Sequence, residues 1–405
     1  MSVLADTPLA QGFPSLDREG IVYLDSAATA QTPRAVLDAM LDYYEHHRAT
    51  VHRSVYPLAA EATELFEGAR RRTAAWLNWP AEATVLTKNA TEAINLVAYA
   101  WGRTNVGPGD RVLVTEMEHH SNFVPWHVLC RERDAILDVI GVDDEAVLDL
   151  DHYDRLLDQG GVKLVAVGHV SNAAGTINPV AEIVRRAHAA GAVVVVDGSQ
   201  AVPQLPVDLA QIDADFYAWT GHKAYGPTGV GVLHGRPELL EAMPPFIGGG
   251  HMIASVAVDD IRWAPIPGKF EAGTSQVAEG IGLGAAVDFL AELGMDAVRA
   301  HERDVCAYAL ERLDEVPGLT VMGPRDADRR GALVAFTLDI AHPHDVAEIL
   351  GSQGVCVRAG HHCAQPLMKR FAVGATSRAS FAVHTTRADV DALVAALGEV
   401  RRIFG

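Results

Sequence analysis

Short apolar runs that alternate with amphipathic, alanine-rich stretches constrain the fold of this chain most strongly. The runs are GDRVLVTE, VKLVAVGHV, GAVVVVDGS, ADFYAWTG and GVGVLHG. The stretches between them, such as PVAEIVRRAHAAG, place apolar residues at helical spacing and stop at glycine. Strands that helices cover on both faces form continuous apolar runs. The alternation therefore predicts an α/β fold with a mostly parallel sheet.

The pattern changes near residue 285, where longer helical stretches begin. The runs GALVAFTLD, VCVRAG and SRASFAVHTT then predict strands, and PHDVAEILGSQG and RADVDALVAALGEVRRIF predict helices. A chain of 405 residues is also too long for one compact core. We therefore expect an N-terminal arm over residues 1–18, a large domain over 19–262, and a linker with a small α+β domain over 263–405.

The charge of the chain argues against binding to nucleic acid or to an anionic membrane. It has 33 basic and 52 acidic residues and a formal net charge of −19. This excess favours solubility, and a basic protein partner is the alternative interpretation. No run reaches the ~20 apolar residues of a membrane span, and the first residues lack the basic and apolar regions of a signal peptide. Four cysteines without a C-x-x-C pair do not form a disulfide framework. We expect a cytoplasmic protein with reduced thiols.

Two polar side chains at predicted strand ends are candidate site residues. Asp197 ends the run VVVVD, and Lys223 follows FYAWTGH in a glycine-rich turn. Ligands of open α/β sheets bind beyond the carboxyl ends of the strands, and a desolvated lysine is a usable amine for imines. A helix-capping aspartate and a lysine that reaches solvent are the structural alternatives.

Two further motifs follow predicted strands. The turn at Asn89, Ala90 and Thr91 precedes a helix, whose free N–H groups are able to hold a phosphate; an ordinary capping box is the alternative. His119 and His120 are adjacent and point apart, so they are unsuited to a shared metal, and no segment has metal-ligand spacing. A lysine, an acid, a helix terminus and a stacking imidazole together meet the needs of pyridoxal phosphate.

The chain resembles the class V aminotransferases, and specifically the SufS-type (group II) cysteine desulfurases. The resemblance extends over essentially the whole chain and includes YLDSAATAQTP, VHRSVYPLAAEATELFEGAR, TEMEHHSNFVPW, VSNAAGTINPV, VVVDGSQAVPQ, WTGHKAYGPTGVGVL, FEAGTSQ, VRAGHHCAQPLM and TSRASFAV. It implies fold type I of the pyridoxal-phosphate enzymes, with a mostly parallel seven-stranded sheet. The chain departs from the family pattern at Ser26, His251 and Ala359, and none of these departures removes a catalytic group.

The resemblance implies a role for each candidate residue around the cofactor. Lys223 would bind its aldehyde, Asp197 would pair with its pyridine nitrogen, and Gln200 would bond its phenolic oxygen. His119 would stack over the ring and belong to the catalytic group. The positions around the phosphate would be Ala90, Thr91, Thr220 and His222.

The resemblance also implies a second subunit and a substrate. Thr274 would reach the phosphate bound by the other protomer of a homodimer. Ala28, Asn172 and Arg378 would hold the substrate L-cysteine, the last two by its carboxylate. Cys363 would be the nucleophile that takes the sulfur as a persulfide and passes it to a SufE-like or SufU-like acceptor for iron–sulfur cluster assembly.

Cys363 lies in the run RAGHHCAQPLM, for which a metal site, a structural cysteine and a nucleophile are competing interpretations. Given a cofactor site, the nucleophile is favoured, because neighbouring imidazolium groups and an arginine would stabilise the thiolate. Cys130, Cys306 and Cys356 lie in apolar patterns and are expected to be packing residues. Selenocysteine lyase, kynureninase, an epimerase and a non-catalytic scaffold are the alternative functions. The GHHCAQPL loop favours an enzyme that handles sulfur or selenium.

Overall fold

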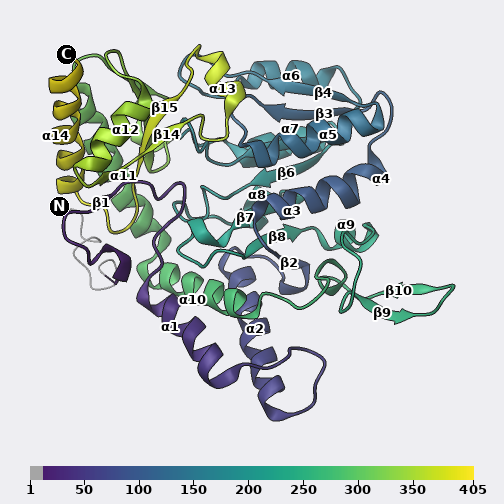
Figure 1. Cartoon of the computed structure of the whole chain (residues 1–405). Helices are drawn as coiled ribbons and strands as arrows, with labels where there is room; N and C mark the ends of the chain where they lie inside the picture. The colour runs from purple at the N-terminus through teal and green to yellow at the C-terminus, as the bar shows by residue number, and fades with distance from the viewer. Residues whose placement is uncertain (1–11) are drawn as a thin grey trace.

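A seven-stranded sheet forms the centre of the larger part of the molecule (Figure 1). The computed structural model describes residues 12–405. In spatial order the strands are β2 (Thr84–Thr87), β8 (Gly231–Gly235), β7 (Phe216–Thr220), β6 (Val193–Asp197), β5 (Val162–Gly168), β3 (Arg111–Thr115) and β4 (Ile136–Ile140). Only β8 runs antiparallel to its neighbours. The predicted α/β fold with a mostly parallel seven-stranded sheet is confirmed, and the five apolar runs form β3, β5, β6, β7 and β8.

Helices cover both faces of this sheet, as continuous apolar strands require. In β6, Val194 and Val196 belong to one apolar cluster, and Val195 belongs to a second cluster on the opposite face. The first cluster includes Ile183 of a covering helix, and the second includes Ile94. The helices inserted between these strands are α3 (Ala90–Leu96), α4 (Arg103–Asn105), α5 (Val124–Arg133), α6 (Leu150–Asp158), α7 (Val180–Ala189) and α8 (Leu209–Ile212).

Three helices pack together beside the sheet (Figure 1). They are α1 (Arg34–Asp42), α2 (Pro57–Trp76) and α10 (Val277–Leu293). After β8, the chain forms α9 (Pro237–Ala242) and the projecting hairpin of β9 (Ile253–Val256) and β10 (Ile261–Trp263) before it reaches α10 (Figure 1). The segment between this hairpin and α10 carries Thr274.

The C-terminal part is a smaller domain with an antiparallel sheet of order β11-β12-β15-β14. Its strands are β11 (Leu319–Met322), β12 (Leu333–Leu338), β14 (Arg358–Gly360) and β15 (Thr376–Ser380). Its helices are α11 (Met295–Asp314), α12 (Pro343–Ser352), α13 (Gln365–Arg370) and α14 (Arg387–Phe404). The prediction of one strand in VCVRAG is wrong, because β13 (Val355–Cys356) pairs with β1 (Val22–Tyr23), whereas β14 pairs with β15.

The parallel pairing of β1 with β13 brings the start of the described chain onto the small domain. The predicted divisions at 18/19 and 262/263 stay predictions, and residues 1–11 of the predicted arm lie outside the described residues. Single helical turns complete the structure at η1 (Pro14–Leu16), η2 (Tyr43–His47), η3 (Ala81–Ala83), η4 (Val97–Gly102), η5 (His120–Asn122), η6 (Gly221–Lys223), η7 (Gly268–Phe270) and η8 (Ala327–Arg329). Within residues 12–405, no helix is long and apolar enough to cross a bilayer.

Candidate active site

A cavity of about 190 Å³ lies at the carboxyl ends of the central strands. β6 ends at Asp197 and β7 ends at Thr220, and both residues line the cavity. This edge of an open α/β sheet is its usual ligand site. The cavity brings together the predicted site residues Ala28, Ala90, Thr91, His119, Asn172, Asp197, Thr220, His222, Lys223, Cys363 and Arg378. Gln200 lines a smaller adjoining hollow with Asp197 and Lys223, whereas Thr274 lines a different pocket.

Lys223 ends the helical turn η6, directly after β7. Burial lowers the pKa of its amine to about 8, although the nearby Asp197 carboxylate favours the charged form. Lys223 is half-buried and lines the cavity, which does not favour the alternative of a lysine that reaches out from the surface. A buried amine with a pKa near neutrality is a suitable nucleophile for an aldehyde and a suitable base.

Asp197 ends β6, and Gln200 lies on the turn that follows it. Asp197 Oδ1 accepts a hydrogen bond from the Ser199 backbone N–H (3.0 Å). No helix begins at residues 198–205, so the alternative of a helix-capping aspartate is wrong. Gln200 Nε2 donates to the carbonyl of Ala27 (2.7 Å), which ties the turn to the N-terminal segment.

Backbone and hydroxyl groups also line the cavity, and α3 begins at its wall. Asn89 caps α3 by accepting the Glu92 N–H at 2.9 Å. A Cβ on Gly231 of the adjacent strand would lie 2.4 Å from the Asn89 carbonyl carbon, so only glycine allows this close approach. The Thr220 Oγ1 and Ser199 Oγ atoms are buried with no hydrogen-bond partner among the described residues. Unpaired buried hydroxyls beside a helix start are suited to a bound phosphate.

His119 follows β3 and is held by Ser121. Its Nδ1 accepts the Ser121 backbone N–H (3.1 Å), which leaves the ring proton on Nε2. Burial, aided by Lys223, lowers the His119 pKa to about 4, so the ring is neutral. The rings of His119 and His120 are 6.4 Å apart and tilted by 45°. A neutral imidazole at the cavity wall is suited to stacking on a planar ligand.

Glu118 precedes His119 and holds this segment in place through its carboxylate. The sequence did not single it out as a site residue. Its carboxylate is buried and accepts hydrogen bonds from Thr115 Oγ1 (2.6 Å), Asn122 Nδ2 (2.6 Å) and the Gly168 N–H (3.0 Å). These donors lie on β3, η5 and β5. Burial raises the Glu118 pKa to about 7. The residue joins two strand ends to the turn that follows His119.

Arg378 lies on β15 and reaches the cavity from the small domain. Its guanidinium is buried, donates to the Asn172 carbonyl at 2.8 Å and pairs with Asp25 at 3.2 Å. Its Nε has no partner among the described residues. Arg358 of β14 also lines the cavity. Two guanidinium groups, one held rigidly, are suited to a carboxylate ligand.

Cys363 sits on the turn between β14 and α13, with its side chain lining the cavity. Its carbonyl accepts the His120 backbone N–H at 2.7 Å, and Asn172 Nδ2 donates to the carbonyl of His362. The nucleophile loop is therefore tied to the large domain. Of the other cysteines, Cys130 and Cys306 are buried as expected, and Cys356 is half-buried in β13.

The structure does not support His362 or His120 as imidazolium groups that stabilise a Cys363 thiolate. Burial lowers the pKa of His362 to about 3, and it also lowers the pKa of His120. Both rings are therefore neutral near pH 7, because a buried ring loses the hydration that stabilises its charge. The positive charges that face the thiol come from arginine and lysine side chains instead.

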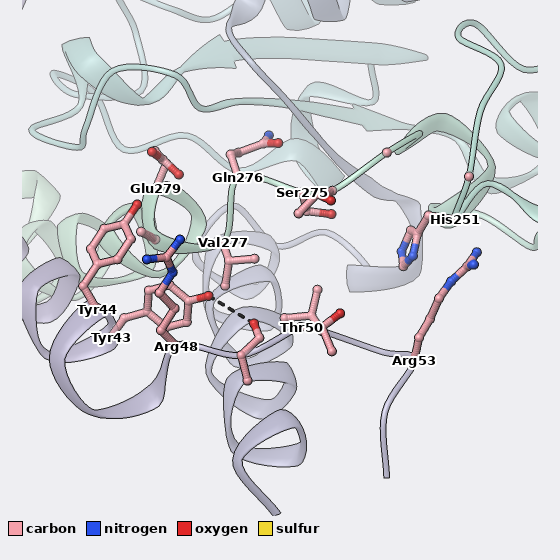
Figure 2. A pocket seen from close by; sticks show the side chains of 16 residues that line it. Tyr43, Tyr44, Arg48, Thr50, Arg53, His251, Ser275, Gln276, Val277 and Glu279 are labelled. Carbon is pink, nitrogen blue, oxygen red and sulfur yellow. Dashed lines mark hydrogen bonds between the residues drawn. The ribbon is translucent and has the colours of Figure 1, made fainter. Parts of the chain in front are cut away.

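Thr274 lines a separate pocket of about 740 Å³ together with Arg48, Arg53 and His251. Figure 2 shows that Arg48 comes from the helical side of this pocket, and that Arg53 and His251 lie at its other end. The pocket does not include Lys223 or Asp197. Thr274 is therefore not in the cavity that holds Lys223 of its own chain.

The cavity fits pyridoxal phosphate. It offers a buried amine, a carboxylate, a neutral imidazole, and unpaired hydroxyls beside a helix start. The class V aminotransferase family model matches residues 22–393. The chain belongs to the class V aminotransferase family.

Individual relatives of the family match along nearly the whole chain. A probable cysteine desulfurase of Streptomyces coelicolor is 49% identical, with 99% of each chain covered. The cysteine desulfurase of Haloferax volcanii is 47% identical over 96% of this chain and 91% of its own. The crystal structure of the cysteine desulfurase CsdA from Escherichia coli has a TM-score of 0.92 and 39% identity, covering 98% of this chain and 100% of that one. The protein is thus an enzyme that depends on pyridoxal phosphate.

Proposed function

We propose that this family member is a cysteine desulfurase that converts L-cysteine to L-alanine and takes the sulfur on Cys363. The observation that carries the proposal is the shared cavity of Cys363, Lys223 and Arg378. A thiol has no role in a related lyase that leaves sulfur alone, whereas a desulfurase needs one within reach of the substrate sulfur. The cysteine desulfurases among its relatives support the same reading.

Lys223 is the proposed anchor and proton carrier. Bound pyridoxal phosphate supplies an electron sink for the carbanion α to the substrate amine. Asp197, Gln200 and His119 would hold its ring, and Ala90, Thr91, Thr220 and His222 would surround its phosphate. Lys223 would hold the aldehyde of the cofactor, and its Nζ, with a pKa of about 8, would be suited to accept the α-proton of the substrate.

Arg378 and Asn172 would orient the substrate. The Arg378 guanidinium is fixed by Asp25 and by the Asn172 carbonyl, so a carboxylate is bound by a preformed group. Ala28 lines the same part of the cavity and leaves room for a small substrate. A lysine at position 378 would not reproduce the planar fork of hydrogen-bond donors.

Cys363 would then attack the substrate sulfur. A bond forms between its Sγ and that sulfur, and the substrate Cβ–S bond breaks. Cβ retains the electron pair and gains a proton, which yields alanine. The persulfide remains on Cys363, so no outside oxidant or reductant is required.

Substitution of Cys363 by alanine tests the proposal. We expect the variant to keep the visible absorbance of bound cofactor and to lose alanine formation from cysteine by about 100-fold or more. Cys356→Ala is the control, because Cys356 lies on β13 outside the cavity. Mass spectrometry after exposure to cysteine should find the added sulfur on Cys363. Unchanged turnover in Cys363→Ala would contradict the proposal.

We also propose that the enzyme belongs to the SufS-type group of cysteine desulfurases. The interval between Cys363 and Arg378 is short and is filled by α13 and the start of β15. A short, tethered loop keeps a persulfide inside a pocket, so a dedicated acceptor of the SufE or SufU type is the expected partner. Such an acceptor would pass the sulfur to iron–sulfur cluster assembly in the cytoplasm. An increase in turnover on addition of either acceptor is the expected result.

Selenocysteine lyase activity is the second candidate function, because the cavity that admits a thiol also admits a selenol. The relative rates with cysteine and selenocysteine decide between the two. A homodimer is part of the proposal as well, because Thr274 lies outside the cavity of its own chain.

A further inference from the structure

Two consecutive residues of the nucleophile loop have an unusual backbone conformation. His362 has φ of 50° and Cys363 has φ of 57°, in the left-handed region that non-glycine residues rarely adopt. Such conformations persist only where the surrounding structure holds them. The groups that hold this turn therefore control where the Cys363 thiol points.

The His362 ring makes the contact on the small-domain side. It is buried, and its Nε2 lies 2.9 Å from Thr376 Oγ1 and 3.2 Å from the Thr376 carbonyl oxygen on β15. A carbonyl only accepts, so Nε2 carries the ring proton and donates it. Nδ1 is buried without a partner among the described residues.

The His362 ring is uncharged near neutral pH. Its pKa is lowered to about 3 by burial, and the Arg378 and Arg358 guanidinium groups add to this effect. His362 therefore neither donates a proton to the reaction nor stabilises a thiolate by charge. Its neighbour His361 is exposed to solvent.

The large domain also holds this turn, through its backbone oxygens. Asn172 Nδ2 donates to the His362 carbonyl, and the His120 N–H donates to the Cys363 carbonyl. Both bonds end on peptide oxygens of the turn. The hydrogen bond of the His362 ring to Thr376 adds a side-chain contact between the same turn and the small domain.

We propose that His362 is a positioning residue that holds Cys363 in its left-handed turn through the hydrogen bond to Thr376. The ring acts as a neutral anchor between the nucleophile loop and β15, whereas His361 has no part in it. The inference rests on the proposed function for the role of Cys363, but the geometry of the anchor does not depend on that role.

Four variants test the anchor. His362→Phe keeps the volume of the ring and removes the donor, whereas His362→Gln places an amide nitrogen near the position of Nε2. His361→Phe and His361→Gln are the matched controls. Two readouts apply to each holoenzyme: the alkylation rate of Cys363 by iodoacetamide, mapped by peptide mass spectrometry, and the steady-state kinetics with cysteine.

For His362→Phe we expect Cys363 to be alkylated about tenfold faster and kcat to fall about tenfold, the scale of one lost buried hydrogen bond. KM should stay near its original value, because Arg378 is untouched. His362→Gln should recover most of both effects, and both His361 variants should match the unmodified enzyme. The absorbance of bound cofactor and the protection of buried Cys130 and Cys306 from alkylation report an intact fold.

Two results would overturn the inference: unchanged alkylation and kcat in His362→Phe, or the same changes in His361→Phe. If His362→Phe does not fold, Thr376→Val decides, since it removes the Oγ1 acceptor from the other side and should change both readouts in the same direction. If the unmodified enzyme forms no alanine from cysteine, the proposed function fails, and the alkylation rates still test the anchor.

Discussion

Burial determines the charge of most ionisable side chains around the cavity. The imidazoles of His119, His222 and His362 are neutral because burial lowers each pKa to about 4 or less. Arg378 and Arg358 keep their positive charge, since a guanidinium resists deprotonation. These three histidines therefore act as neutral rings that pack and form hydrogen bonds, and the arginines supply the positive charge.

The pKa of Lys223 leads to a prediction about cofactor loading. Only the neutral amine attacks an aldehyde, so the rate at which apoprotein takes up added pyridoxal phosphate should rise with pH around a midpoint of about 8. Asp197 favours the charged amine, so Asp197→Asn should move the midpoint to lower pH. Stopped-flow absorbance measures both. A midpoint near the ordinary lysine pKa of 10.5 would contradict the burial of this amine.

At the scale of the element, glycines allow α10 to approach α2 closely. A Cβ on Gly284 would lie 2.7 Å from the Ala69 Cβ, and one on Gly280 would lie 2.7 Å from the Phe66 ring. These distances are shorter than side-chain contacts allow. The glycines of α10 therefore allow the short distance between α10 and α2. Because α10 begins shortly after Thr274, this packing also positions the segment that carries Thr274.

Replacement of Gly284 by alanine should destabilise the protein by about 1–3 kcal/mol, the usual cost of overpacking. Gly398 of α14 is the control, because a Cβ there would meet nothing within 4 Å. Gly398→Ala should stabilise by about 0.5–1 kcal/mol through helix propensity alone. Urea denaturation measures both free energies of unfolding. Stabilisation by both substitutions would refute the packing argument.

The elements were predictable from sequence where local pattern decides them. The run that ends at Asp197 is apolar throughout because helices cover both its faces, and that periodicity is visible in the sequence. The seven-strand count and the site assignments came from the family resemblance. The division of VCVRAG into β13 and β14 was not predictable, because it depends on two distant partners, β1 and β15.

The electrostatic state of the site was not predictable from sequence for the same reason. The neutrality of His362 depends on what covers the ring, and its partner Thr376 is on another strand. The sequence analysis did not identify Glu118 and Ser199 as site residues. Each is a polar residue shortly after an apolar strand run, and this position could have identified both.

At the scale of the whole molecule, two domains contribute to one cavity, and a further residue stands outside it. Lys223 and Asp197 come from the large sheet, and Cys363 and Arg378 come from the small domain. Thr274 lines the pocket in Figure 2 instead. A role for Thr274 at a phosphate therefore requires a second copy of the chain.

A mixed dimer tests this requirement. One chain carries Lys223→Ala and the other carries Thr274→Val, and the two are co-expressed with different tags and purified together. If Thr274 acts across the interface, one of the two sites combines an intact Lys223 with an intact Thr274. That site should bind pyridoxal phosphate as tightly as the unmodified enzyme, whereas the Thr274→Val homodimer binds it more weakly. If Thr274 acted within its own chain, every site that keeps Lys223 would lack Thr274, and a cofactor titration would find only the weak affinity.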